Sequence, residues 1–121
     1  MISLREALQS MVETVGGGIG AVIMGYDGIA IDEYIAPETT FDVQLLSVEY
    51  SNLLKEIKQA VNVLKTGSME EVAINTDISR VLIRVINDDY FLVLVLDADG
   101  NFGKGRYLLK KFAPQFGESL Q

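Results

Sequence analysis

Cysteine and histidine are both absent from this chain of 121 residues. The absence of cysteine excludes disulfides and thiolate nucleophiles, and the two absences together exclude Cys/His zinc sites. Without imidazole, the chain also lacks the side chain that most often exchanges protons near neutral pH. We therefore expect a protein that is not an enzyme, with no catalytic residue, no cofactor and no metal site.

Positive charge is also scarce, because 10 Lys and Arg residues oppose 17 Asp and Glu residues and leave a formal net charge of −7. The basic residues are scattered along the sequence, whereas nucleic acids and anionic membranes require clustered Lys and Arg. No apolar segment approaches the roughly 20 residues that span a bilayer, and the first residues lack the basic start and apolar core of a signal peptide. We expect a cytoplasmic protein without membrane insertion and without a nucleic-acid partner.

Linkers, repeats and low-complexity tracts are missing as well. A chain of this length is large enough to bury a core without disulfide or metal staples. The sequence therefore predicts one domain over residues 1–121.

The first third of the chain predicts a helix and a β-hairpin. Ser3 and Glu6 form a capping-box pattern, and apolar residues follow at helical spacing until three glycines end the predicted helix of residues 3–15. Two apolar runs, 19–24 and 29–35, lie on either side of a turn that contains Asp-Gly. This pattern predicts a hairpin, because glycine accepts the positive φ of a tight turn.

A long amphipathic helix is predicted for residues 40–66, where neither Pro nor Gly occurs and Gly67 is the expected C-cap. One stripe of the helix is apolar, and we expect it to be buried either in the core or in a dimer. It consists of Leu46, Tyr50, Leu53, Ile57, Ala60 and Leu64.

Three short runs in quick succession, 72–76, 80–86 and 90–97, predict an antiparallel meander. A last helix follows, with Asn101 as its expected N-cap and Pro114 near its end. The first and last strands are apolar on both faces and are expected at the centre of the sheet. The predicted fold is therefore α+β, in the order α-β-β-α-β-β-β-α, with one five-stranded antiparallel sheet whose edges are the second and third strands.

The length of the long helix suggests a second copy. About 25 residues give a helix of roughly 37 Å, whereas five strands make a sheet only about 24 Å wide. Pairing of two helices and two edge strands would use the excess and cover an exposed edge.

Two glycine-rich segments resemble phosphate-binding loops only superficially. In "GGGIGA" the helix precedes the glycines and the strand follows them, which is the reverse of the dinucleotide-binding order. "GNFGKGR" lies at a helix start but lacks the Lys-Ser/Thr end of a Walker loop. We interpret both as sites where backbone packs closely, rather than as phosphate sites.

The remaining charged candidates favour structural roles. The carboxylates of the turns lack the alternating ligands of an EF-hand loop. Arg80 and Arg84 lie on one strand face, where pairing with carboxylates is more common than the role of an arginine finger.

The polar face of the long helix is either a partner surface or a hydrated face, and the sequence favours neither. Its residues are small or weakly charged, so a partner would approach at a low desolvation cost. They are Gln44, Ser47, Ser51, Lys55, Lys58 and Asn62.

The order of elements resembles the Roadblock family, the dynein light chain group with MglB-like bacterial members. The resemblance covers nearly the whole chain, including "LREALQSMVETVGG", "GAVIMGYDGIAIDEY" and, above all, "LVLDADGNFGKGRYLLKKF". In the last segment, Asn101, Gly103, Arg106 and Tyr107 occupy the positions at which the family enters its final helix.

This resemblance implies a dimer, expected to be a homodimer, in which the third strands pair and the long helices pack on one face, with the other helices on the opposite face. It also implies binding of small Ras-like GTPases across the paired long helices. The implied partner-binding residues are Ser47, Ser51, Lys55 and Asn62, and the implied dimer residues are Tyr50, Ile57, Val72, Ala73, Ile74 and Asn75.

Two hypotheses follow for the function. In the first, the protein is a dimeric regulator or scaffold that acts on the switch loops of a GTPase without an arginine of its own. In the second, the same fold is a structural adaptor or ligand sensor with a non-GTPase partner.

Overall fold

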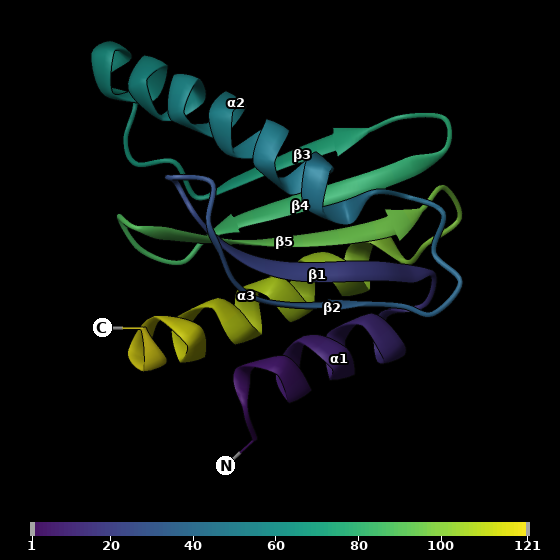
Figure 1. The fold of residues 1–121 in the computed structure, drawn as a ribbon. Coiled ribbons are helices and arrows are strands. Elements are labelled where there is room, and N and C mark those ends of the chain that lie inside the picture. Colours follow the sequence, from purple (N-terminus) through teal and green to yellow (C-terminus); the bar gives the residue numbers. More distant parts are fainter. Residues whose placement is uncertain (1, 121) are drawn as a thin grey trace.

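A computed structural model describes residues 2–120 of the chain, and its order of elements is the predicted one. The elements are α1 (Leu4–Val15), β1 (Gly18–Gly25), β2 (Ala30–Ile35), α2 (Val43–Leu64), β3 (Glu71–Asn75), β4 (Ser79–Val85), β5 (Tyr90–Asp97) and α3 (Phe102–Ser119). Figure 1 shows one open sheet with helices on both of its faces.

The five strands form one antiparallel sheet in the order β2-β1-β5-β4-β3. The predicted topology is confirmed: β1 and β5, the most apolar strands, pair at the centre, and β2 and β3 are the edges. The central position of β1 and β5 explains their apolar composition, because a central strand of a sheet covered on both faces meets no water on either side.

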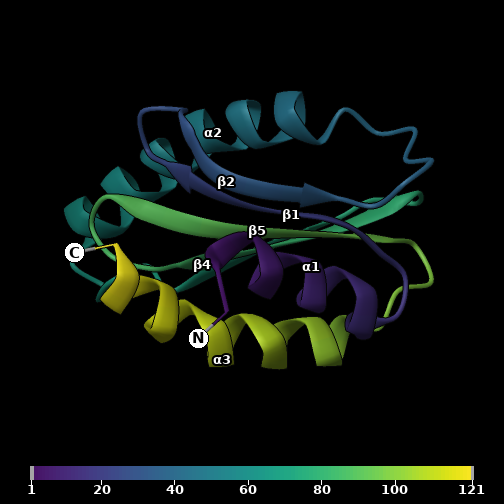
Figure 2. The same cartoon turned by 60° about the horizontal axis from the view of Figure 1, so that its bottom comes forward.

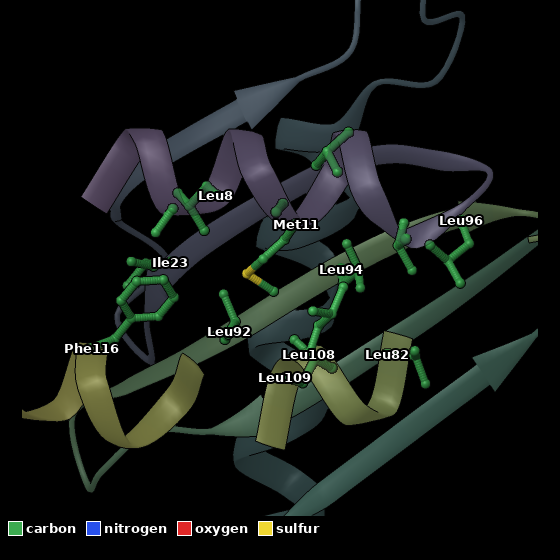
Figure 3. Close-up of a cluster of buried hydrophobic side chains, with 14 residues drawn as sticks. Leu8, Met11, Ile23, Leu82, Leu92, Leu94, Leu96, Leu108, Leu109 and Phe116 are labelled. Carbon is green, nitrogen blue, oxygen red and sulfur yellow. The ribbon is translucent and has the colours of Figure 1, made fainter. Parts of the chain in front are cut away.

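Helices α1 and α3 cover one face of the sheet, and α2 lies alone on the other (Figure 2). The α1/α3 face encloses the larger core, in which leucines of the two helices point at leucines of β4 and β5 (Figure 3). Leu8, Leu94 and Leu109 in this core have no exposed surface. The α2 face carries a separate cluster around Val22, Leu54 and Phe91.

The helix starts agree with the sequence. Ser3 and Glu6 form the complete capping box of α1, and the Asn101 side chain accepts the backbone N–H of Lys104 at the start of α3. The α3 helix continues through Pro114 to Ser119. The end of α2 differs from the prediction, since the C-cap is Lys65 with φ 56°, and not Gly67.

The β1–β2 hairpin is closed by a turn in which the Gly25 N–H donates to the Ile29 carbonyl at 2.9 Å. Asp27 accepts the Ile29 N–H at 3.0 Å, and Gly28 has φ 86°, the positive value that the Asp-Gly pattern predicts.

The two glycine-rich segments are sites of close packing, as expected. A Cβ at Gly18 would overlap the Val12 carbonyl oxygen in α1. A Cβ at Gly105 would lie 2.8 Å from a Leu82 methyl group in β4, so this glycine lets the first turn of α3 approach the sheet.

Candidate partner-binding surface

The face that α2 turns toward the sheet is not the face that its apolar stripe predicts. The residues of α2 that are buried are Val43, Ser47, Ser51 and Leu54. The predicted exposure of Ser47 and Ser51 is therefore wrong: their exposed fractions are 0% and 1%.

The two serines lie against the protein because their hydroxyl groups need no water. Ser47 Oγ donates to the Val43 carbonyl at 2.8 Å, and Ser51 Oγ donates to the Val48 carbonyl at 2.6 Å. A serine bonded to its own helix is a small and satisfied residue, so it allows close packing. A Cβ on Gly28 of the hairpin would lie 3.7 Å from Ser51 Oγ. The sequence contains one indication of this buried face. Val43, Ser47 and Leu54 recur at helical spacing and form a second stripe, in which serine is small enough to pack among apolar residues.

Lys55 and Asn62, the other two predicted partner-binding residues, are exposed. Asn62 borders a hollow of about 250 Å³ together with Lys58 and Tyr26. Lys58 is anchored there, because its Nζ lies 4.5 Å from the centre of the Tyr26 ring and donates to the Asp88 carbonyl at 3.4 Å.

Tyr26 is the titratable residue of this region whose ionisation the fold changes. Its hydroxyl oxygen is buried and has no hydrogen-bond partner among the described residues. Burial raises the pKa of the phenol above its ordinary value of 10.0, and the Asp88 carboxylate raises it further.

The apolar stripe of α2 is left partly uncovered. Leu53 is 40% exposed and Leu64 is 69% exposed, while Leu46 and Tyr50 pack only partly against the core on this face. Ile57 is half-buried. The first part of the stripe thus packs against the core of the single chain, and its last part is exposed. At the end of α2, Val63 is also exposed, and Figure 1 shows this end projecting past the sheet.

The β3 edge lies next to this stripe. Val72 and Ile74 of β3 are half-buried and pack against the same core cluster as Tyr50. The side chains of Glu71, Ala73 and Asn75 alternate with them and therefore lie on the α1/α3 side of the sheet.

The backbone of β3 offers a free row of hydrogen-bonding groups. The bonds from the Val85 N–H to the Glu70 carbonyl and from the Thr76 N–H to the Ser79 carbonyl, both 2.9 Å, fix the alternation of the β3–β4 ladder. In an antiparallel ladder the residues between bonded pairs point their backbone groups away. The N–H and C=O of Glu71, Ala73 and Asn75 accordingly face outward, ready for another strand.

The remaining candidates of the sequence analysis have structural roles. Arg84 pairs with Glu70 at 3.8 Å and with Glu71 at 3.9 Å, and Arg80 Nε donates to the Ala98 carbonyl at 3.0 Å. Within residues 2–120, no three Asp or Glu side chains are grouped in a way that could hold a metal ion. None of the helices described is both long and apolar enough to cross a membrane.

The interpretation of the basic residues as scattered is wrong for one element. Lys104, Arg106, Lys110 and Lys111 are all exposed on α3. The sequence signal was the absence of any acidic residue between Asp99 and Glu118.

Several solved structures are similar to this chain over nearly its whole length. The chain is 42% identical to MglC from Myxococcus xanthus over 98% of its own length and 100% of that protein, with a TM-score of 0.71. A Roadblock/LC7 domain from Streptomyces avermitilis has a TM-score of 0.84 at 13% identity, with 98% of each chain covered. MglB from Myxococcus xanthus has a TM-score of 0.83 at 10% identity, with 95% of this chain and 92% of that one covered.

The chain belongs to the Roadblock/LC7 family, as its sequence resemblance predicts. Within this family its sequence is more similar to MglC than to MglB, whose likeness at 10% identity concerns the fold. No protein-family model matches the chain, and a search of curated proteins matches none. The relationship to MglC points to a regulatory or scaffolding role.

Proposed function

We propose that this chain is a dimeric, non-enzymatic regulator or scaffold of a small Ras-like GTPase, the role that its family resemblance implies. The observation that supports the proposal is that an unpaired strand edge and an exposed apolar surface lie next to each other. The free edge of β3 and the uncovered apolar stripe of α2 adjoin the same core cluster. A second copy related by a two-fold axis would cover both at once.

In this dimer the β3 strands pair through the outward backbone groups of Glu71, Ala73 and Asn75, and Tyr50, Ile57, Val72 and Ile74 line the contact beside them. The paired α2 helices then form a platform for the GTPase. Lys55 and Asn62 are its polar contacts from the predicted set, and Leu45 and Val48 add exposed apolar surface. The buried Ser47 and Ser51 act only by bringing α2 close to the sheet.

The first experiment measures the solution mass of the wild type and of Ala73→Pro by light scattering. The Ala73 N–H faces the free edge, so proline at this position removes a donor for a partner strand and leaves the β3–β4 ladder intact. We expect a wild-type mass of about twice 13.3 kDa, and a monomer of unchanged circular dichroism for the variant.

A second variant and a control complete this experiment. Ile74→Lys places a charge in the contact and should also give a monomer. Ile78→Lys, in the exposed β3–β4 turn, is the matched control and should remain dimeric. A monomeric wild type would remove the platform and most of the case for GTPase regulation.

The GTPase is tested next, by titrating the dimer into small Ras-like GTPases of the source organism in their GDP and GTP-analogue states. A complex that depends on the nucleotide, and that Lys55→Glu weakens, supports the regulator. A dimer that binds no Ras-like GTPase in either state favours the adaptor with a non-GTPase partner, which the same platform would serve.

A further inference from the structure

Positive charge gathers on the side of the molecule opposite α2. The chain as a whole carries a net charge of −7, yet α3 exposes four basic residues and no acidic residue over its first four turns. Two of them, Arg106 and Lys110, lie one turn apart on the flank of α3 that faces β3, because Arg106 reaches Glu71 of that strand.

This flank of α3 borders a hollow of about 220 Å³ at the edge of the sheet. We call it the basic pocket. Its lining comes from three elements and consists of Glu71 of β3, Arg84 of β4, and Arg106, Tyr107 and Lys110 of α3. Three cations against one carboxylate give the lining residues a net charge of +2, and the neighbouring Glu70 carboxylate, 3.8 Å from Arg84 Nη2, reduces the local excess to +1.

The Glu71 carboxylate of the basic pocket holds the Arg106 guanidinium group in place and lies near that of Arg84. Glu71 Oε2 lies 2.9 Å from both Arg106 Nε and Arg106 Nη2, and Glu71 Oε1 lies 3.9 Å from Arg84 Nη1. The side chains of Glu71 and Arg84 are each only 19% exposed. Within residues 2–120, Lys110 makes no ion pair. The pocket thus has one guanidinium group fixed by Glu71, a second, largely buried one between Glu70 and Glu71, and the ammonium group of Lys110.

We infer that the basic pocket binds an acidic side chain from an extended, acidic segment of a partner protein. Arg106 contacts Glu71 through Nε and Nη2, so its Nη1 remains for a second carboxylate, which the Lys110 ammonium group one turn along the helix would also attract. The pocket opens on the α1/α3 side of β3, and an extended segment that runs along this side would present every second side chain to it without using the backbone edge of β3. Tyr107, 62% exposed at the rim, offers an amphipathic contact surface.

A short acidic segment fits the charge distribution better than a nucleic acid does. Charges more than about 8 Å apart are largely screened at physiological ionic strength, so a short segment responds mainly to the local cations. A long polyanion would also approach the acidic remainder of a chain of net charge −7. This inference goes beyond the proposed function, because the basic pocket belongs to one chain and lies on the face opposite α2.

The test uses an acetylated peptide of about ten residues, alternating Glu and Ser, which spans roughly 33 Å when extended. It is titrated into the ¹⁵N-labelled full-length protein at ~0.15 M salt, where surface steering is screened. We expect amide shift changes centred on residues 71, 84 and 106–110, and an affinity that Lys110→Glu lowers about tenfold.

Lys111→Glu is the matched control, since it makes the same charge change on the same helix one residue away, on another flank. It should lower the affinity by less than about threefold. Equal losses in both variants, or shift changes spread over all lysines, would reduce the effect to net charge and overturn the inference. Tighter binding of single-stranded oligothymidylate at the same residues, or the absence of peptide binding at millimolar concentration, would overturn it as well.

The monomeric variant Ala73→Pro separates this inference from the proposed function. It should bind the peptide as the wild type does, whatever the outcome of the GTPase experiments. A loss of peptide binding in Ala73→Pro would show that the acidic segment needs the dimer, and would overturn the assignment of the pocket to a single chain.

Discussion

The two faces of the sheet differ in how completely the chain covers them. On the α1/α3 face, two helices cover the sheet, and Leu8, Leu94 and Leu109 have no exposed surface. On the α2 face one helix covers a comparable area, and Leu53, Val63 and Leu64 stay exposed. Since apolar surface left in water forfeits about 25 cal/mol per Å², the α1/α3 face contributes more to the stability of the single chain than the α2 face does.

The largest expected effect comes from truncating a buried side chain on the α1/α3 face, which we call the closed face; the α2 face is the open face. Leu109→Ala should lower the free energy of unfolding by about 3 kcal/mol, because it leaves a cavity among well-packed leucines. Leu53→Ala, on the open face, should cost less than about 0.5 kcal/mol in the monomeric Ala73→Pro background. Urea unfolding of both variants measures the difference, and equal losses would contradict the contrast between the faces.

Close packing on the closed face can also be disrupted at a glycine, by adding a methyl group where two backbone segments touch. In Gly18→Ala the new methyl group meets the fixed Val12 carbonyl of α1, so we expect a loss of about 2 kcal/mol. Gly103→Ala is the control, since its methyl group would have only Asn101 Oδ1 near it, at 3.9 Å. That variant should be neutral or more stable by up to about 1 kcal/mol, because alanine favours a helix. Thermal unfolding with matched buffers distinguishes the two.

A smaller effect tests the correction at α2. Ser47→Ala removes a hydroxyl that is bonded only to its own helix, so stability should change by less than about 0.5 kcal/mol. Ser47→Leu, by contrast, adds three carbons between α2 and the sheet and should cost about 2 kcal/mol. A Ser47→Leu variant as stable as the wild type would show that the serine faces solvent after all.

The smallest effect appears only in alkali. The raised pKa of Tyr26 means that the unfolded chain releases the phenolic proton first as the pH rises above 10.0, so stability falls as the pH passes from there through the folded pKa. Below pH 10.0 the wild type and Tyr26→Phe should differ little, except that phenylalanine leaves no unbonded hydroxyl. Above it, the stability of the wild type should fall more steeply, and parallel pH profiles of urea unfolding would refute this assignment.

Local chemistry explains which features the sequence predicts. The Ser3–Glu6 capping box, the Asn101 N-cap and the Asp-Gly turn each depend on residues within a few positions of one another, and all three are present in the structure. The strand order follows from the apolar composition of β1 and β5, because only central strands bury both faces.

The features that the sequence does not predict depend on contacts between distant segments. Which flank of α2 meets the sheet is decided by the fit of Ser47 and Ser51 against the protein, and not by the stronger apolar stripe. The basic pocket combines β3, β4 and α3, so Arg84 and Lys110 read as separate surface charges until the strands are in place. Lys65 ends α2 in a left-handed conformation, two residues before the Gly67 that the sequence predicts as the C-cap.

The pairing of β1 with β5 also constrains how the chain is made. Val22 lies opposite Val93 in the central ladder, 93 − 22 = 71 positions later in the chain. A ribosome adds about 5–20 residues per second, so the edge of β1 that pairs with β5 has no partner strand for several seconds. During that time β2, α1 and α2, which precede β5 in the chain and pack on β1 in the finished fold, are available to shield it. The sheet therefore closes late, and the helices that cover the two faces of its central strand are made before the strand that completes its pairing.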